Sequence, residues 1–118
     1  MTQRQRQSKQ KVADSLFAQY IRARDVFCQR CGGTEVLQCA HVISRRYAAT
    51  RFAPLNAMLL CRSCHMWQTV NPLEGEDWFR EQLGSEIFDE LRRVAMTGGP
   101  VDYKTLIPDL RRRLEAAA

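Results

Sequence analysis

Four of the five cysteines form two pairs with the spacing of metal ligands. Cys28 and Cys31 make one C-x2-C pair, and Cys61 and Cys64 make a second. Together they supply four thiolates, which is the tetrahedral donor set of a structural zinc ion. We therefore predict a structural Zn²⁺ site, the alternative being four buried cysteines without metal. Cys39 is left over, and we expect it to be a small buried apolar residue.

Both histidines of the chain lie in the segment framed by these cysteines. His41 falls in a strand predicted over about 35–44, and His65 directly follows the last cysteine, where a helix is expected to begin. Asn56 lies between them, in a Pro-Leu-Asn turn. Imidazoles titrate near neutral pH and also bind metal ions. The order His–Asn–His in a strand–loop–strand–helix segment resembles the arrangement of a ββα-metal nuclease site.

The residues around the two histidines carry a family resemblance. The stretches LQCAHVISRR and LNAMLLCRSCHMW resemble the HNH (His-Me finger) endonucleases. The preceding YIRARDVFCQRCG is similar to bacteriophage members, among them the NinG/Rap-type recombination nucleases. The resemblance covers about residues 15–85, and the residues beyond Gly84 add nothing to it. It implies a metal-dependent DNA endonuclease in phage DNA recombination, replication or packaging, acting in the host cytoplasm.

The resemblance also implies a role for each polar residue. His41 is implied to be the general base that takes a proton from the water attacking a DNA phosphorus. His65 is implied to hold a catalytic divalent ion, Mg²⁺, Mn²⁺ or another, which stabilises the developing charge. Asn56 is implied to bond the backbone across the loop and so orient the strand of His41. Cleavage would leave 5′-phosphate and 3′-hydroxyl ends, and cutting both strands would need a homodimer or two successive nicks.

One position departs from the family pattern. Many HNH enzymes carry an Asp or His just before the base as a second metal ligand, and this chain has Ala40 there. The residue one helical turn after His65 is Thr69. Water and DNA phosphate would then complete the shell of a hard divalent ion, with Gln38 as the nearest substitute ligand. The alternative is a non-catalytic zinc-ribbon DNA-binding protein, and a further one is a nuclease selective for branched DNA.

Positive charge gathers in the first half of the chain. Residues 1–51 carry ten Lys and Arg against three acids, residues 52–118 carry eight against ten, and the net charge is +5. This asymmetry favours a polyanionic partner. We expect Arg45, Arg46 and Arg51 to contact DNA phosphates. Residues 1–11 have no apolar residue after Met1, so we expect a flexible basic arm that follows the DNA backbone.

Length and hydropathy limit the architecture. A chain of 118 residues favours one domain, and at this size a metal would add needed stability. No apolar run resembles a membrane span or a signal peptide, so we expect an intracellular location and no membrane partner. The predicted fold is a small zinc-stabilised α+β, ββα-metal (His-Me finger) domain over 12–118 with flanking N- and C-terminal helices. Its predicted segments are a first helix at 12–26, a ββα core at about 35–72, and C-terminal helices within about 76–115, with Pro108 splitting the last helix or marking its start.

Overall fold

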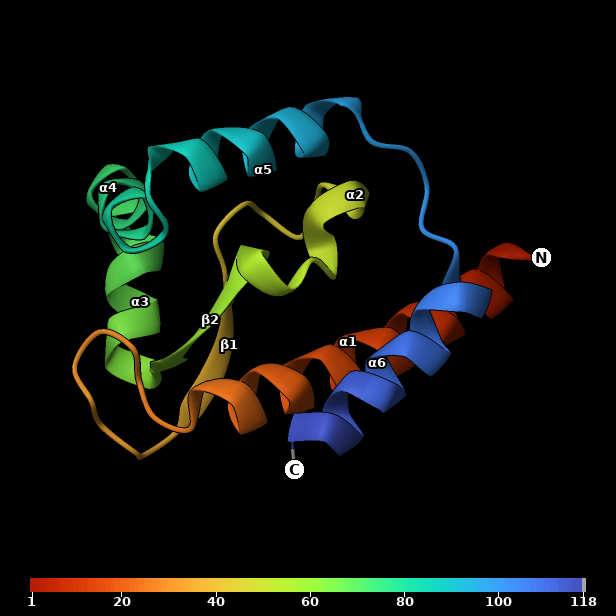
Figure 1. Ribbon diagram of the computed structural model, residues 1–118, viewed down its shortest axis with the longest axis horizontal. Coiled ribbons are helices and arrows are strands. Elements are labelled where there is room, and N and C mark those ends of the chain that lie inside the picture. The colour runs from red at the N-terminus through yellow and green to blue at the C-terminus, as the bar shows by residue number, and fades with distance from the viewer. Residues whose placement is uncertain (118) are drawn as a thin grey trace.

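A computed structural model describes residues 1–117 of the protein (Figure 1). The fold is a small α+β arrangement in which one β-hairpin is surrounded by helices. In chain order the elements are α1 (Gln3–Asp25), β1 (Leu37–His41), α2 (Ala48–Arg51), a 3₁₀ turn (Pro54–Asn56), β2 (Ala57–Cys61), α3 (Arg62–Val70), α4 (Pro72–Leu83), α5 (Ser85–Thr97) and α6 (Tyr103–Ala117).

The two strands pair antiparallel, with Leu37 opposite Cys61 and His41 opposite Ala57. The first strand is shorter than the predicted 35–44. Val36 has a φ of 48°, which no regular strand contains, so pairing begins only at Leu37. After His41 the backbone turns away from the ladder into the loop that carries α2. The hairpin therefore ends at the histidine, and the loop covers it.

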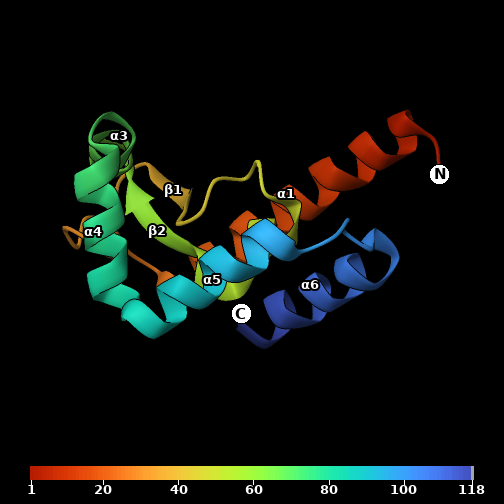
Figure 2. The same ribbon diagram turned by 90° about the horizontal axis from the view of Figure 1, so that it is seen from above.

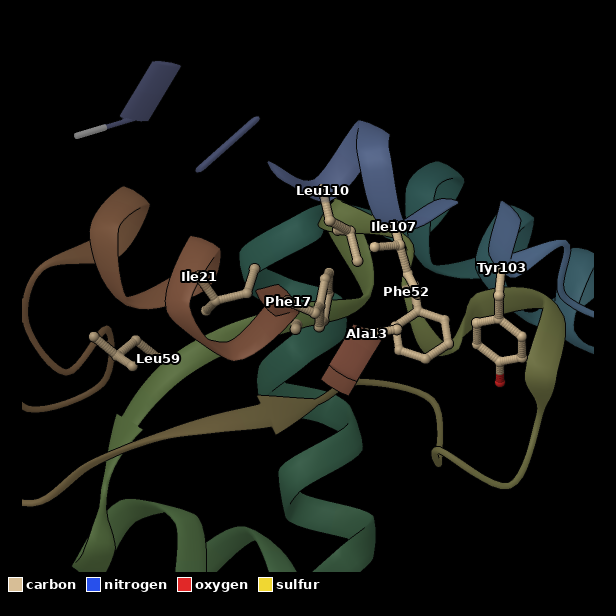
Figure 3. Close-up of a cluster of buried hydrophobic side chains, with 9 residues drawn as sticks. Ala13, Phe17, Ile21, Phe52, Leu59, Tyr103, Ile107 and Leu110 are labelled. Carbon is tan, nitrogen blue, oxygen red and sulfur yellow. The ribbon is translucent and has the colours of Figure 1, made fainter. Parts of the chain in front are cut away.

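Each face of the hairpin packs against its own apolar cluster. On one side lie α1, α6 and the start of β2, shown in Figure 3; the buried residues are Ala13, Phe17, Ile21, Phe52, Ala57, Leu59, Tyr103, Ile107 and Leu110. On the other side α3, α4 and α5 enclose Cys28, Ala40, Leu60, Cys64, Phe79 and Phe88. Successive side chains of a strand face opposite sides, so neighbouring residues of β1 belong to different clusters.

Helix α1 is longer than predicted, and the expectation of a flexible arm at 1–11 is wrong from Gln3 onward. The side chain of Thr2 caps the helix and Gln5 completes a reciprocal capping box. Gln, Lys and Arg also have high helix propensity. The Arg6 guanidinium donates to the Val101 carbonyl at 3.3 Å and lies over the Tyr103 ring, so this end is attached to α6.

Helices α1 and α6 lie side by side and run in the same direction, as Figures 1 and 2 both show. Pro108 does not split or start the last helix, contrary to expectation, and α6 is continuous around it. Proline costs one backbone hydrogen bond inside a helix. Burial of Ile107 and Leu110 on either side of it against α1 offsets that cost.

The junction between α3 and α4 follows the sequence signal at Asn71-Pro72. Helix α3 ends at Val70, and α4 begins at Pro72, four residues before the predicted start. Proline suits the first position of a helix because its missing N–H has no intrahelical partner there. The short connection sets α4 against α3, and α3 packs beside both strands of the hairpin (Figure 1).

Candidate metal centre and histidine site

The four paired cysteines converge on one point. Their Sγ atoms all lie within 4.8 Å of one another, and those of Cys31 and Cys61 are 3.6 Å apart. Sulfurs around a tetrahedral zinc ion with bonds of about 2.3 Å lie about 3.8 Å apart. Cys28 and Cys64 are buried, and the other two lie nearer to solvent. This donor set fits zinc, so the structure contains a candidate structural metal centre.

Short local hydrogen bonds shape the first cysteine pair. The Cys28 N–H donates to the Gly33 carbonyl at 2.8 Å, and Gly32 adopts a φ of +78°, which closes the turn. The N–H of Gly33 and the N–H of Cys31 approach cysteine sulfurs at 3.4 and 3.5 Å. The Gln29 N–H donates to the Leu59 carbonyl at 2.9 Å. The first pair is thereby attached to β2, which leads directly into the second pair.

Arg30 is a neighbour of the cysteine cluster that sequence reasoning missed. Its guanidinium lies 3.7 Å from the centre of the Trp67 ring and donates to Cys64 Sγ at 3.5 Å. A cation beside thiolates offsets part of the negative charge of a four-cysteine metal site.

Cys39 lies apart from this cluster and packs beside α1, where burial raises its pKa to about 11 and keeps the thiol neutral.

His41 ends β1 with its imidazole against α1. The ring centre lies 5.6 Å from that of Phe17, and Nε2 lies 2.9 Å from the Arg51 carbonyl. A carbonyl can only accept, so a neutral His41 must carry its proton on Nε2, which leaves the lone pair on Nδ1. Burial lowers the pKa of His41 and outweighs the hydrogen bond to the Arg51 carbonyl, which raises it; the positive charges of Arg45 and Arg51 also lower it. The imidazole is therefore neutral at pH 7 and able to accept a proton.

Asn56 makes the cross-loop bonds expected of it. Its side chain is fully buried; Oδ1 accepts the Ile43 N–H at 2.8 Å, and Nδ2 donates to the carbonyls of Ile43 and Thr50 at 3.0 and 2.9 Å. Its own carbonyl accepts the Val42 N–H at 2.8 Å. A single residue thus holds both ends of the loop that follows His41.

His65 lies in the first half of α3, as expected from the sequence. Its Nδ1 lies 2.8 Å from Gln38 Oε1, so Nδ1 donates to that amide oxygen and Nε2 keeps its lone pair. Burial lowers the pKa of His65, and the charge of Arg45 lowers it further. Gln38, expected as the nearest substitute metal ligand, here accepts this hydrogen bond from His65. The Thr69 hydroxyl donates to the His65 carbonyl at 3.0 Å.

The two imidazoles belong to opposite faces of β1. Gln38 and His41 are three residues apart in the strand, so their side chains lie on opposite faces. The Gln38 side chain faces α3 and His65, whereas the His41 side chain faces α1. The positive charge of Arg45 lowers the pKa of both histidines. Within residues 1–117, the cysteine quartet is the only group of three or more His, Cys, Asp or Glu placed to hold a metal ion.

The three arginines predicted to contact phosphate differ in their surroundings. Arg45 and Arg46 are exposed in the loop after β1 and form no salt bridge within residues 1–117. Arg51 instead forms a two-point salt bridge with Asp14 of α1, at 3.0 and 2.7 Å. Its guanidinium is held inside the protein and does not extend to solvent beside the other two. Sequence reasoning missed Asp14, which lies 37 positions away in the chain.

Compared with known proteins, the chain matches no protein family, no curated protein and no solved structure. Among the helices of residues 1–117, none combines the length and the apolar character needed to cross a bilayer.

Proposed function

We propose that the protein is a metal-dependent endonuclease that hydrolyses phosphodiester bonds of DNA. The observation that carries this proposal is the state of His41. Its imidazole is neutral, its Nε2 proton is committed to the Arg51 carbonyl, and no hydrogen-bond partner for Nδ1 is found within residues 1–117. A half-buried imidazole with one lone pair to offer is suited to act as a general base.

In the proposed reaction, His41 Nδ1 accepts a proton from a water molecule whose oxygen attacks the phosphorus. The new O–P bond forms as the bond from phosphorus to the 3′-oxygen breaks, which leaves a 5′-phosphate and a 3′-oxygen that takes a proton from solvent water to become the 3′-hydroxyl. Asn56 supports this step because its three side-chain bonds fix the loop that follows the base. A fixed base adds to the rate because less orientational freedom is lost on reaching the transition state.

His65 Nε2 is the nitrogen proposed to hold the catalytic divalent ion. The ion would supply Lewis-acid stabilisation of the charge that develops on the phosphate and the leaving oxygen. The hydrogen bond from His65 Nδ1 to Gln38 supports this role, because second-sphere acceptors orient metal-binding imidazoles. With alanine at position 40, the chain offers a single imidazole, so water and DNA phosphate oxygens, which hard divalent ions accept, would complete the shell of the ion.

Arg45 and Arg46 are proposed to bind the DNA phosphates beside the scissile bond. Both are exposed, and the charge of Arg45 reaches both histidines. The zinc ion is proposed to be structural, since the cysteine cluster joins the loop after α1 to the junction of β2 and α3. Two active sites in a homodimer, or successive nicks by one, would cut both strands. Action in phage DNA metabolism remains a prediction from the sequence resemblance.

The second candidate is a zinc-ribbon protein that binds DNA without cutting it. Ala40 favours this alternative, as does the absence of a second group of metal-binding side chains from residues 1–117. A wild-type protein that binds DNA in a salt-dependent manner and cleaves nothing with any divalent ion would support it. Selectivity for branched DNA is a variant of the nuclease proposal, and equal rates on junction, flap and linear duplex would contradict it.

The test is nicking of supercoiled plasmid with Mg²⁺ or Mn²⁺, comparing wild type with His41→Ala and His65→Ala. We expect each variant to lose roughly 10²-fold or more of the activity, a usual contribution of a general base. Added imidazole should restore part of the activity of His41→Ala but not that of His65→Ala. Met66→Ala, an exposed neighbour on α3, is the matched control and should cut normally. Folded histidine variants that cut as fast as wild type would contradict the proposal.

A further inference from the structure

We propose that Asp14 and Arg51 form a positioning pair that sets the protonation state of His41. The side chain of Arg51 is fastened to α1 through Asp14, and the backbone carbonyl of Arg51 accepts the His41 Nε2 proton. The pair thereby determines that Nδ1 is the nitrogen left to act as base. Its catalytic consequence rests on the proposed nuclease function.

The Arg51 guanidinium is fixed by three hydrogen bonds. Nε donates to Asp14 Oδ1 at 3.0 Å, Nη2 donates to Oδ2 at 2.7 Å, and Nη1 donates to the Arg45 carbonyl at 3.1 Å. The side chains of Arg51 and Asp14 are only 16% and 28% exposed. A two-point arginine–carboxylate pair with this little solvent is the strong, geometrically specific form of a salt bridge.

The carbonyl of Arg51 needs such an anchor because α2 is a single turn. The helix has four residues, and Tyr47 before it provides no side-chain cap. A helix of this length has no stability of its own. Helix α1, in contrast, has 23 residues, and Ala13 and Phe17 on either side of Asp14 are buried in the core. The salt bridge therefore transfers the rigidity of α1 to the carbonyl that contacts His41.

The same pair controls the charge around the imidazole. Three charged groups act on His41: Asp14 from α1, Arg45 from the loop and Arg51 from α2. The opposing strand residue, Ala57, is uncharged. Asp14 is the single negative group of the three, so its carboxylate offsets the two guanidinium charges. Loss of that carboxylate should lower the pKa of His41 further, because protonation would then add a third positive charge.

The decisive experiment is an NMR titration of the two histidine rings in the full-length, zinc-loaded protein. With only two histidines in the chain, His65→Gln assigns the signals. We expect Asp14→Asn and Arg51→Met to shift the His41 titration and to speed exchange of its Nε2 proton, with the His41 pKa lower in Asp14→Asn. Asp109→Asn, which removes an ion-paired carboxylate from α6, is the matched control and should change neither. An unchanged His41 in folded Asp14→Asn and Arg51→Met would overturn the proposal.

Plasmid nicking then separates positioning from phosphate binding. Loss of positioning should lower kcat on the order of 10–100-fold in Asp14→Asn with KM unchanged, and Asp14→Glu should recover part of the rate. A phosphate contact by Arg51 predicts instead a raised KM in Arg51→Met and no effect of Asp14→Asn, and this result would overturn the positioning role. If wild type does not nick DNA, the nuclease proposal fails, and the titration alone decides whether the pair sets the state of His41.

Discussion

The cysteine cluster and the histidine site differ in how their polar side chains are arranged. The four cysteine sulfurs converge from two short segments to within 4.8 Å of one another. The side chains of His41, Asn56 and His65 instead each contact a different partner: the Arg51 carbonyl, the loop backbone and Gln38. The cluster is a complete donor set formed by the chain itself. The histidine site is a set of oriented groups, to which the proposed function would add a cation and a phosphate from outside the chain.

This difference shows which kinds of site local sequence can specify. A C-x2-C pair needs only its own tight turn to aim both sulfurs at one ion. The orientation of His41, in contrast, depends on Asp14 and Arg51, which are far apart in the chain. Three perturbations, described from the largest expected loss of protein stability to the smallest, test how much each of the two regions contributes to that stability.

Removal of the metal should have the largest effect. The purified protein should contain about one zinc per chain, and strong chelation or Cys64→Ser should abolish cooperative thermal unfolding. Zinc binding by a four-cysteine site contributes on the order of 10 kcal/mol, which rivals the whole stability of a small domain. Zinc analysis and circular dichroism measure the outcome. Cys39→Ala, outside the cluster, should keep its zinc, and a metal-free sample with an unchanged Tm would contradict the structural role.

Asn56→Ala should have the next largest effect, on the histidine side of the comparison. The substitution removes three hydrogen bonds at a fully buried position and leaves the backbone N–H and carbonyl of Ile43 without partners. We expect a loss of about 2–4 kcal/mol in the free energy of unfolding, measured by urea denaturation. The control is Asn71→Ala, which removes one bond to the Trp67 carbonyl and should cost about 1 kcal/mol or less. Equal losses would mean that Asn56 does not fasten the loop.

Sequence reasoning identified the features whose signal is local. The cysteine pairs converge as predicted, His41 lies in a strand and His65 in a helix, although the strand is shorter than expected; the cross-loop bonds of Asn56 agree with what the family resemblance implied. The helical start of the chain was missed because its stability does not come from apolar periodicity. It comes from the cap at Thr2 and from the contacts of Arg6 with Val101 and Tyr103.

The pairing partners were also beyond local reasoning. Nothing in the spacing of Asp14 and Arg51, or of Gln38 and His65, indicates that these side chains meet. Such contacts are created by packing between elements that are distant in the chain. Without knowledge of this packing, the sequence around Arg51 at the end of α2 looks the same whether the side chain binds a phosphate or a carboxylate. The catalytic roles themselves stay predictions, since they depend on ligands outside the chain.

The smallest of the three effects should be the contribution of His41 to the pH dependence of stability. Its pKa is lowered in the folded protein by burial and by the charges of Arg45 and Arg51, so the unfolded chain binds more protons in mildly acidic solution. Stability should therefore fall as pH decreases below about 6.5, the ordinary histidine pKa, until the lowered folded pKa is passed. Above that window the contribution is constant, because both states are neutral.

His41→Gln should remove part of this acid sensitivity, measured as the urea midpoint at several pH values between neutral and mildly acidic. His65 also has a lowered pKa, so some sensitivity should remain in the variant and disappear only when both histidines are replaced. Nicking activity should depend on the same imidazole but fall at a lower pH than stability does. Because the base must be neutral, the rate should fall only as pH drops through the lowered His41 pKa of the folded protein. A wild-type stability that does not depend on pH in this window would contradict the buried, neutral imidazole on which the proposed reaction depends.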